Sequence, residues 1–462
     1  MQFHVLTLFP EMIEKGCDNS ILKRAMEKDL IRVNAVDIRD FTQEKHGKVD
    51  DYVYGGGAGM LMQAQPVYDA WQFVAKDPEM EKKVRTVYVT PKGVPFTQKH
   101  AKEFSKEESL IILCGHYEGI DERVLDEIVT DRISIGDFVL TGGELPALVM
   151  IDAISRLIPG VLGSEESFET ETFEQDLLEY PQYSRPETWH DKTVPEVLLS
   201  GDHKKIQAWR LEEAMKLTKA VRPDLYEKYQ ERQKLIRLLM KHKKENAFLI
   251  DGLMRSTARV IHAEGDQVIA RDVNTGTVMI CGDGLENGER LLKWLPEDCK
   301  LVLHNCREIN EVLQERFGFG KPDECYQSVY TQQTSLPIAH KDVRLFPMSE
   351  LAYAAANYGK DSEEYLKDRI EAKQFFAAYD EDRLVGFCGI HAGGSLGLLF
   401  VDPEYRRGSV GSSLASHLVN KALERGGIPY AHIRVANVAS LKMQEKMGLY
   451  VGKKTVFWLH RD

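Results

Sequence analysis

Residues 134–146 read Ser134-Ile135-Gly136-Asp137-Phe138-Val139-Leu140-Thr141-Gly142-Gly143-Glu144-Leu145-Pro146. This stretch leads directly into a helical pattern, Pro146–Leu157. Glycine allows positive φ angles and close backbone approach, so main-chain N–H and C=O groups here can touch a ligand. In α/β proteins such ligands lie outside the carboxyl ends of the strands. The stretch therefore predicts an α/β fold with a ligand site in this loop.

Two further glycine loops support this prediction. Tyr54–Met60 holds four glycines within five positions, and Cys114–Arg123 begins where a buried apolar run ends. Neither these loops nor the first segment forms a G-x-G-x-x-G after the first strand, which argues against a Rossmann dinucleotide site.

Short apolar runs alternate with helical patterns over residues 1–160. Strands separated by helices indicate a mostly parallel sheet. The expected strands are Phe3–Phe9, Val84–Val89 and Leu110–Cys114, and the expected helices are Glu11–Lys28, Gln65–Ala75 and Pro146–Leu157.

The second half of the chain has a different organisation. Residues 160–185 are polar and acidic, as in a linker, and Leu198–Lys244 has a helical pattern. Residues 247–335 mix strands and helices, and a second α/β unit begins at Val343. The strands expected within 247–335 are Arg259–His262, Gln267–Ile269, Thr277–Cys281 and Leu301–His304, with helices near Leu285–Trp294 and Glu308–Phe317.

Charge and composition limit the class of protein. The 462 residues carry a net charge of −12, which taken alone argues against a nucleic-acid partner. Residues 202–244, however, hold 13 Lys/Arg against 6 Asp/Glu. This basic stripe suits phosphate contacts, although a solvated helix face has the same composition.

The chain also reads as a cytoplasmic protein. No apolar run approaches the roughly 18 residues of a membrane span, and the first ten residues read as a strand rather than a signal peptide. The seven cysteines form no C-x-x-C pair, as expected of reduced thiols.

Taken together, the three loops and the segments around them resemble the bacterial tRNA (guanine-N1)-methyltransferase family (TrmD), of the trefoil-knotted SPOUT class. The resemblance covers about the first 240 residues. The matching segments are Val5–Pro10, Val49–Asp51, Ser134–Pro146, Ile151–Arg156, Ile158–Gly163, Leu177–Pro186, Val197–His203 and Arg222–Leu225.

The resemblance implies a homodimer that binds S-adenosyl-L-methionine (SAM) in a knotted pocket and grips tRNA with its basic C-terminal helices. Glu118 would face the sulfonium or amino group of the cofactor. Residues implied in substrate binding are His46, Asp50, Gly57 and Gly59, although His46 reads equally well as an ordinary loop histidine. Residues implied in SAM binding are Tyr88, Val89, Thr90, Pro91, Gly115, Glu118, Ser134, Ile135, Gly136, Asp137, Phe138, Val139, Leu140, Gly142, Gly143 and Pro146.

The implied reaction needs a base and a cation. Guanine N1 is a poor nucleophile until its proton leaves, which a carboxylate can accept. An arginine beside O6 stabilises the charge that develops there, and Arg156 matches the family arginine. The family usually places Asp-Ser-Phe before Leu-Leu-Glu, where this chain has Glu171-Thr172-Phe173. Glu171 is therefore the candidate base, with Glu166 and Glu169 as rivals. A solvated linker and assistance by Mg²⁺ stay open.

Residues 394–412 form a second segment that is suited to ligand binding. A strand, a basic glycine turn and a helix N-terminus make an anion site. The segment resembles the R-x-x-G-x-G/A motif of GNAT acetyltransferases, which cradles the pyrophosphate of CoA, although Ser409 replaces its central glycine. Gln444 stands where many such enzymes place a tyrosine acid. Residues implied in acetyl-CoA binding are Phe400, Val401, Arg406, Arg407, Gly408, Ser409, Val410, Gly411, Ser412 and Asn437.

These patterns together predict a bifunctional cytoplasmic α/β enzyme. The expected domains are a SPOUT methyltransferase (1–163), a linker with the catalytic loop (164–185), a helical tRNA-binding domain (186–245), a degenerate GNAT-like lobe (246–335) and a GNAT domain (336–462). The acyl acceptor is unknown. Two alternatives are a catalytically inactive tRNA-binding module that delivers an acyltransferase, and an active methyltransferase with a CoA-sensing domain.

Overall fold

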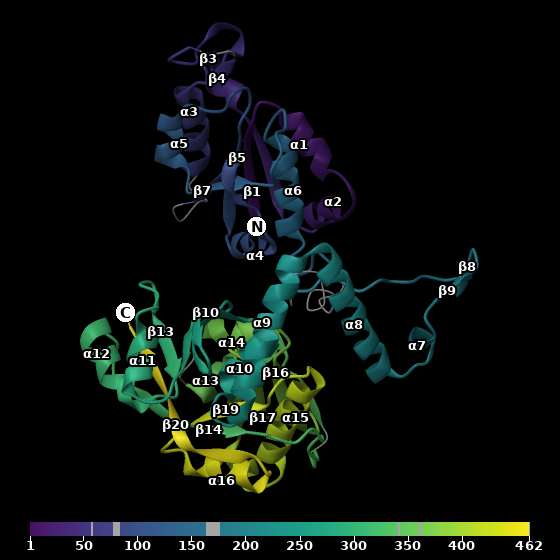
Figure 1. The fold of residues 1–462 in the computed structure, drawn as a ribbon, viewed down its shortest axis with the longest axis vertical. Helices are drawn as coiled ribbons and strands as arrows, with labels where there is room; N and C mark the ends of the chain where they lie inside the picture. The colour runs from purple at the N-terminus through teal and green to yellow at the C-terminus, as the bar shows by residue number, and fades with distance from the viewer. Residues whose placement is uncertain (57–58, 77–83, 163–175, 341, 360–362, 462) are drawn as a thin grey trace. The chain divides into compact units, whose positions relative to one another are not determined.

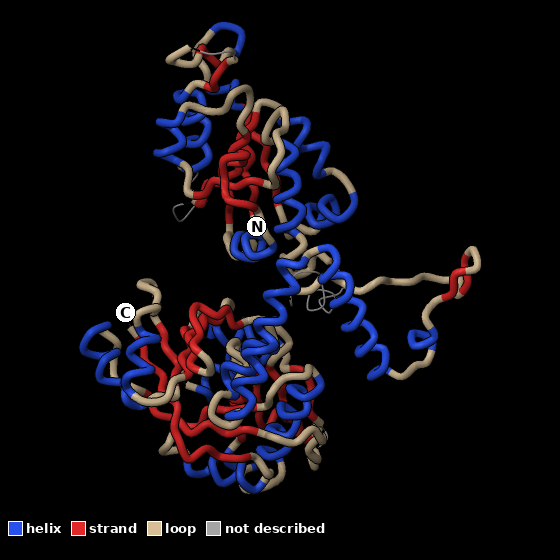
Figure 2. The backbone as a smooth tube through the Cα atoms, in the orientation of Figure 1, coloured by secondary structure: helices blue, strands red, loops and turns tan. Residues whose placement is uncertain are grey.

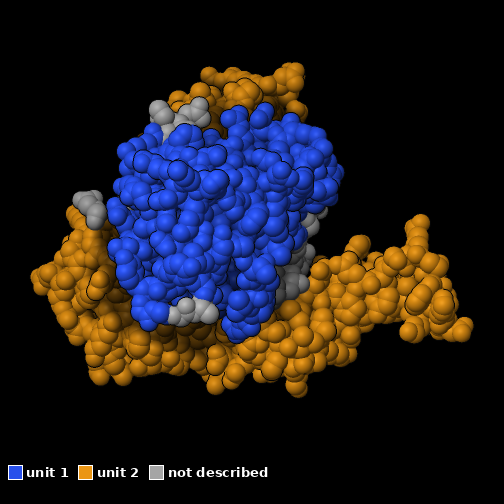
Figure 3. Space-filling model, turned by 90° about the horizontal axis from the view of Figure 1, so that it is seen from above, with its two compact units in different colours: residues 1–173 blue, residues 174–462 orange. Residues whose placement is uncertain are grey.

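The computed structural model describes residues 1–462 except 57–58, 77–83, 163–175, 341, 360–362 and 462. The chain divides into two compact units, residues 1–173 and 174–462, which Figure 3 colours separately.

Unit 1 is built on a five-stranded parallel sheet in the order β2-β1-β6-β5-β7 (Figure 1). Its strands are β1 (Gln2–Thr7), β2 (Arg32–Asp37), β5 (Arg85–Pro95), β6 (Ser109–Cys114) and β7 (Asp131–Ser134). The three apolar runs predicted from sequence form β1, β5 and β6, so the predicted parallel α/β sheet is confirmed. The trefoil knot stays a prediction.

Helices cover both faces of this sheet (Figure 2). Ile13, Phe104 and Met150 pack on one face, and Val67 and Leu125 on the other. The helices are α1 (Pro10–Cys17), α2 (Ser20–Glu27), α3 (Ala64–Ala75), α4 (Gln98–Phe104), α5 (Glu122–Ile128) and α6 (Glu144–Ser155), and a small antiparallel pair adds β3 (Asp50–Tyr52) and β4 (Met60–Met62).

The single helix expected at Glu11–Lys28 is two helices, which corrects that expectation. The backbone N–H of Asp18 donates to the carbonyl of Glu14 at the end of α1, and Asn19 takes an extended conformation before α2. Asp and Asn favour helix ends because their side chains compete for backbone hydrogen bonds. The apolar period alone did not reveal the break.

Unit 2 opens with an exposed segment and four helices. The basic stripe of residues 202–244 lies mostly on α8 (His203–Val221) and α9 (Pro223–Leu239), where Pro223 begins the second helix at its first position. The other elements here are β8 (Thr188–Trp189), β9 (Lys192–Thr193), α7 (Glu196–Leu199) and α10 (Ala247–Met254).

The remainder of unit 2 holds two sheets. The seven-stranded sheet, in the order β10-β11-β12-β13-β20-β14-β19, comprises β10 (Ala258–Glu264), β11 (Gln267–Asp272), β12 (Val278–Cys281), β13 (Leu301–His304), β14 (Asp323–Val329), β19 (Tyr430–Arg434) and β20 (Tyr450–His460). The four-stranded sheet comprises β15 (Val343–Leu345), β16 (Phe375–Asp380), β17 (Arg383–Ile390) and β18 (Leu396–Val401).

Six helices complete two similar lobes. Lobe 1 runs from β10 to β14 and holds α11 (Leu285–Leu292) and α12 (Asn310–Phe317). Lobe 2 runs from β15 to β20 and holds α13 (Leu351–Tyr358), α14 (Glu363–Glu371), α15 (Val410–Glu424) and α16 (Val438–Lys446).

The two lobes exchange their last strands. Lobe 1 ends β13-α12-β14, and lobe 2 ends β19-α16-β20. In the sheet, β20 lies between β13 and β14, and β14 lies between β20 and β19. Each lobe therefore completes the sheet of the other.

The last helix of the basic stripe belongs to the same core. Ile236 and Leu239 of α9 pack in one cluster with Phe248 and Leu253 of α10 and Val329 of β14. The predicted boundary between residues 245 and 246 therefore falls within a shared core, although the division into domains stays a prediction.

Candidate functional site

A cavity of about 500 Å³ opens in unit 1 at the carboxyl ends of β6 and β7 and beside residues 88–92 in the middle of β5. These ends are where an α/β sheet binds ligands. The lining residues are Leu61, Tyr88, Val89, Thr90, Pro91, Lys92, Gly115, His116, Tyr117, Glu118, Gly119, Ile120, Glu122, Leu125, Arg132, Ile133, Ser134, Ile135, Gly136, Phe138, Val139, Leu140, Thr141, Gly142, Gly143 and Pro146.

Close backbone contact holds the loops of this cavity together. The N–H of Gly143 donates to the carbonyl of Gly115 at 3.0 Å, and His116 forms an isolated antiparallel bridge with Gly142. A Cβ on Gly143 would lie 2.7 Å from Cα of Cys114. Glycine at 143 is therefore required by packing, because backbone cannot yield to a methyl group.

The hairpin of β3 and β4 docks on the loop that carries Glu118. The N–H of Glu118 donates to the carbonyl of Met60 at 3.0 Å, and that of Met62 donates to Gly119 at 3.0 Å. Gly59 has a φ of +108°, and a Cβ there would collide with Oε1 of Glu118. The glycine loop thus ends directly against the side chain of Glu118.

Glu144 is a buried carboxylate that sequence reasoning missed. Its Oε1 accepts a hydrogen bond of 2.7 Å from the Thr7 hydroxyl, and its Oε2 lies 3.9 Å from Nε2 of His116. Glu144 is 3% exposed and opens α6, where the helix dipole favours a negative charge. An acid inside an otherwise apolar helix start was the signal that could have identified it.

The structure brings most predicted SAM residues together. All of them except Asp137 line the cavity, whereas their contact with SAM stays a prediction. His46 is exposed, and neither it nor Asp50 lines the cavity. Gly57, Glu171 and its rivals Glu166 and Glu169 lie outside the described residues.

Arg156 does not join this cavity within one chain. It follows the last residue of α6, whereas Gly143 precedes the first. The 12 residues of α6 rise about 1.5 Å each. The two ends of the helix are therefore roughly 18 Å apart.

The Tyr88 hydroxyl in the cavity wall and the Cys114 thiol next to Gly115 are neutral at physiological pH. Burial raises the pKa of the Tyr88 hydroxyl, while a hydrogen bond from Thr90 opposes the shift. Burial also holds the pKa of the Cys114 thiol well above its usual range. Both groups therefore contribute shape and polarity rather than charge.

Clusters of metal ligands, disulfides and membrane-spanning helices are all absent from the described part of the chain. Within it, no group of three His, Cys, Asp or Glu side chains could hold a metal ion, and assistance by Mg²⁺ stays a prediction. The seven cysteines are buried and unpaired. None of the described helices is both long and apolar enough to cross a bilayer.

The predicted anion turn of lobe 2 connects β18 to α15. Arg407 has a φ of +64°, and Ser409 precedes the first residue of α15. Nε of Arg406 donates to the carbonyl of Val401 at 3.0 Å, so this guanidinium lies against the end of β18. Asn437 caps α16 by accepting from the N–H of Ser440 at 3.2 Å, and its contact with acetyl-CoA stays a prediction.

Lobe 2 also has a split between its central strands. β18 and β19 are neighbours, yet they are the edges of two different sheets. Leu398, in the middle of β18, has a φ of +50°, and pairing with β17 shifts between Phe387 and Gly389. A bulge of this kind bends a strand and is common beside active sites.

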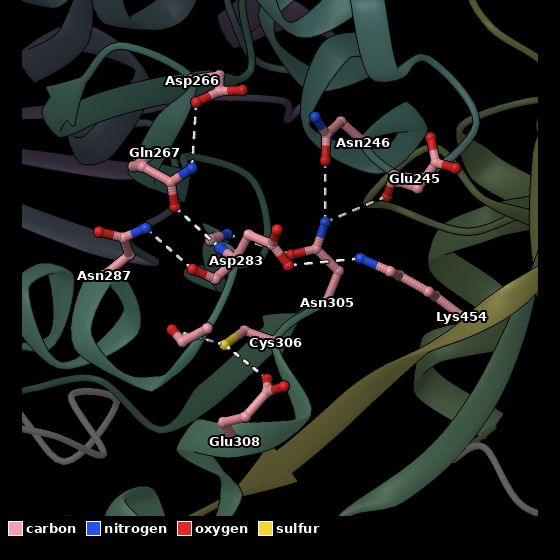
Figure 4. Close-up of polar contacts among 12 residues, drawn as sticks. Glu245, Asn246, Asp266, Gln267, Asp283, Asn287, Asn305, Cys306, Glu308 and Lys454 are labelled. Carbon is pink, nitrogen blue, oxygen red and sulfur yellow. Dashed lines mark hydrogen bonds and ion pairs between the residues drawn. The ribbon is translucent and has the colours of Figure 1, made fainter.

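Lobe 1 lacks both the open anion turn and the split between central strands. β12 and β13 pair through to Ile280 and His304, which closes the corresponding split. Figure 4 shows how side chains occupy its turn. The N–H of Gly282 donates to Oδ1 of Asn305 at 3.2 Å, and that of Asp283 donates to Oε1 of Gln267 at 2.9 Å. Two backbone amides of this turn are therefore already bonded, and the turn carries the carboxylate of Asp283, which forms an ion pair with Lys454.

The fold and the cavity define an α/β enzyme whose ligand site lies at the carboxyl ends of parallel strands. Comparison with known proteins agrees. The family described as tRNA (Guanine-1)-methyltransferase TrmD matches residues 1–228, and the Acetyltransferase (GNAT) family matches residues 344–449.

Individual relatives match the same half of the chain. A tRNA (guanine-N(1)-)-methyltransferase of Lachnospira eligens is 59% identical over 229 residues, which cover 50% of this chain and 96% of that protein. Proteins of the same description from Clostridioides difficile and Clostridium botulinum are 57% and 54% identical, over 50% of this chain and 100% and 93% of theirs. The chain belongs to the TrmD tRNA (guanine-N1)-methyltransferase family and carries a C-terminal GNAT domain.

Proposed function

We propose that unit 1 transfers the methyl group of SAM to N1 of the guanine 3′ of the anticodon, position 37, in tRNA. The observation that carries the proposal is the cavity at the carboxyl ends of β6 and β7 and beside the middle of β5, formed by the same loops that resemble the family's SAM site. A cytoplasmic location follows from that substrate.

Different residues of the chain bind the cofactor, remove the proton and stabilise the developing charge. SAM supplies an activated methyl group on a sulfonium. Backbone groups of Gly115, Gly142 and Gly143 orient it, and the carboxylate of Glu118 faces its positive end. Glu171 removes the proton from guanine N1, and Arg156 stabilises the negative charge that develops on O6.

The position of Arg156 supports a homodimer. Since the arginine lies at the far end of α6 from the cavity, one chain does not assemble the complete site. A second copy brings its own arginine to the target base. Exposed apolar side chains around the cavity mouth, such as Phe138, Val139 and Leu145, suit burial by that copy.

The basic stripe supports tRNA binding. Most of the lysine and arginine side chains in the stripe are exposed to solvent. They can therefore contact the phosphates of a tRNA. The exposed members are Lys204, Lys205, Arg210, Lys216, Lys219, Lys228, Lys234, Arg237, Lys241 and Lys244.

The site-specific assignment predicts that label from methyl-labelled SAM enters a tRNA transcript with guanine at position 37 and not one with adenine there. The reason is that N1 of adenine carries no proton for the base to remove. Adenine also has an amino group at C6 in place of the O6 of guanine. Equal label in both transcripts would contradict the assignment. SAM binding without any transfer would favour the alternative of an inactive tRNA-binding module.

For lobe 2 we propose binding of acetyl-CoA and acyl transfer to an amine. The open split between β18 and β19, next to a turn with Arg406 and Arg407, supports this reading. Since lobe 1 is closed and its turn amides are bonded, calorimetry should find one acetyl-CoA per chain. Two sites per chain would contradict the difference between the lobes. Binding without turnover would favour a CoA-sensing domain.

A further inference from the structure

Two histidines lie near the split in lobe 2. His432 is in the middle of β19, and His391 follows β17 at the turn into β18. Ala431 and Ile433, which flank His432, pack in the cluster that includes α15. Because side chains alternate along a strand, His432 faces the opposite side of the sheet from α15.

Gln327 fixes the tautomer of His432. It is the cross-strand partner of His432 and is 1% exposed. Its Nε2 donates to the carbonyls of Lys244 at 2.8 Å and Glu245 at 3.0 Å. Since carbonyls only accept, the amide has one orientation, and its Oε1 is the atom that lies 3.2 Å from Nε2 of His432. Nε2 of His432 must then carry the hydrogen.

The other ring nitrogen is left as a lone-pair acceptor. Nδ1 of His432 is buried and has no hydrogen-bond partner among the described residues. Leaving a buried polar atom without a partner is destabilising, because the atom loses its hydrogen bonds to water and gains none in return. An unpartnered buried acceptor can bond a ligand or an ordered water, and in His432 it belongs to a strand that borders the split of lobe 2.

The surroundings keep the ring neutral. It lies against the rings of Phe248, Tyr430 and Trp458, with centroids 6.1, 5.3 and 5.6 Å away. Burial lowers the pKa of His432 to about 3, and His391 adds to the effect. Nδ1 is therefore unprotonated at physiological pH.

Gln444 replaces the tyrosine that donates a proton in many GNAT enzymes, and a glutamine amide cannot give up a proton in this way. Gln444 is 8% exposed, and its Oε1 accepts a hydrogen bond from the Ser328 hydroxyl at 3.1 Å. Proton transfer in lobe 2 therefore has to use another group.

We propose that His432 is the catalytic residue that receives the acceptor's proton in acyl transfer, with Gln327 as its positioning residue. The role rests on the proposed acyl-CoA site of lobe 2. The acceptor is a primary amine. Its nitrogen forms a bond to the thioester carbonyl carbon, the C–S bond breaks, and sulfur leaves with the electron pair. The amine proton passes to Nδ1 and then to the thiolate, giving the free thiol of CoA.

A weakly basic ring suits this order of events. It does not compete for the proton of a free ammonium group. It accepts one only after attack on the carbonyl has made the nitrogen strongly acidic. Returning the proton to sulfur is then favourable, because a free thiol has a pKa of about 8.5.

The experiment combines turnover with a measurement that needs no acceptor. Release of CoA thiol is followed with free amino acids, a polyamine and a lysine-containing peptide. His432→Asn keeps a hydrogen-bond acceptor near Nδ1 but cannot carry the proton, so kcat should fall by about 10²-fold or more with KM for acetyl-CoA unchanged. Gln327→Met should lower kcat by releasing the ring. His417→Asn, a half-buried histidine on α15, is the matched control and should keep wild-type turnover.

The acceptor-free readout is the ¹⁵N spectrum of the histidine rings at neutral pH, with His432 assigned by its loss in His432→Asn. A protonated Nε2 and an unprotonated Nδ1 that shifts on adding acetyl-CoA would support the proposal. The opposite tautomer, an Nδ1 indifferent to acetyl-CoA, or unchanged kcat in His432→Asn would each overturn it. If calorimetry shows no acetyl-CoA binding by the wild type, the proposed function of lobe 2 itself fails.

Discussion

Replacing Glu171 with alanine should lower the rate of methyl transfer by a factor of about 10²–10⁴, the range typical of a lost general base. Guanine N1 keeps its proton without a base, so the attack on the methyl group slows. The cofactor cavity is formed by other loops, and SAM affinity should therefore stay unchanged. Single-turnover transfer to tRNA and calorimetry with SAM measure the two quantities separately.

The neighbouring acids provide the controls for this variant. Glu166→Ala and Glu169→Ala remove the same charge from the same acidic segment, and both should retain most of the activity. Glu171→Asp restores the residue usual in the family and tests whether the segment has adapted to the longer side chain, because a 1 Å misplacement can cost about 10²-fold. Full activity in Glu171→Ala, or the large loss in Glu169→Ala instead, would contradict the assignment.

The cofactor region could be predicted from the sequence because its information is local. Two of the three glycine loops follow β6 and β7, and the carboxyl ends of neighbouring strands bring such loops together wherever a parallel sheet forms. Asp137 was the exception, since it lies within the loop yet does not line the cavity. His116 and Glu144 were missed because their roles depend on contacts between loops far apart in the chain.

Other features were beyond the reach of sequence patterns. The break between α1 and α2 depends on two capping residues inside an unbroken apolar period. The distance of Arg156 from the cavity follows only from the direction of α6. The neutral His432 was not noticed at all, because its tautomer is set by Gln327, more than 100 residues away in the chain.

The exchange of strands between the lobes was also not predictable from periodicity. A strand pattern at residues 450–460 does not indicate which neighbouring strands this strand will pair with in the sheet. Its neighbours are β13 and β14, both from lobe 1, and the structure alone reveals this pairing. The consequence is that the final strand stabilises a region that begins about 200 residues earlier.

Deleting residues 450–462 should therefore unfold both lobes rather than only the C-terminal one. Val456, Phe457 and Leu459 of β20 are at most 2% exposed, and their removal leaves β13 and β14 each without one of its two neighbouring strands. Burial of each such side chain contributes about 1.5–3 kcal/mol before cavity costs. The sum approaches the whole stability of a typical domain, about 5–15 kcal/mol, even before the lost hydrogen bonds are counted.

The loss should extend to tRNA binding. Because Ile236 and Leu239 of α9 pack in the core that β20 joins through Val456, unfolding of the lobes removes the support of a helix in the basic stripe. The truncated chain should keep SAM affinity in unit 1 and lose tRNA affinity, and its calorimetric scan should lack the transition of unit 2. Lys453→Ala and Lys454→Ala, at exposed positions of the same strand, are the controls. A truncated chain that retains that transition and binds tRNA normally would show that the lobes fold without exchanged strands, and that the methyltransferase half is independent of the GNAT half.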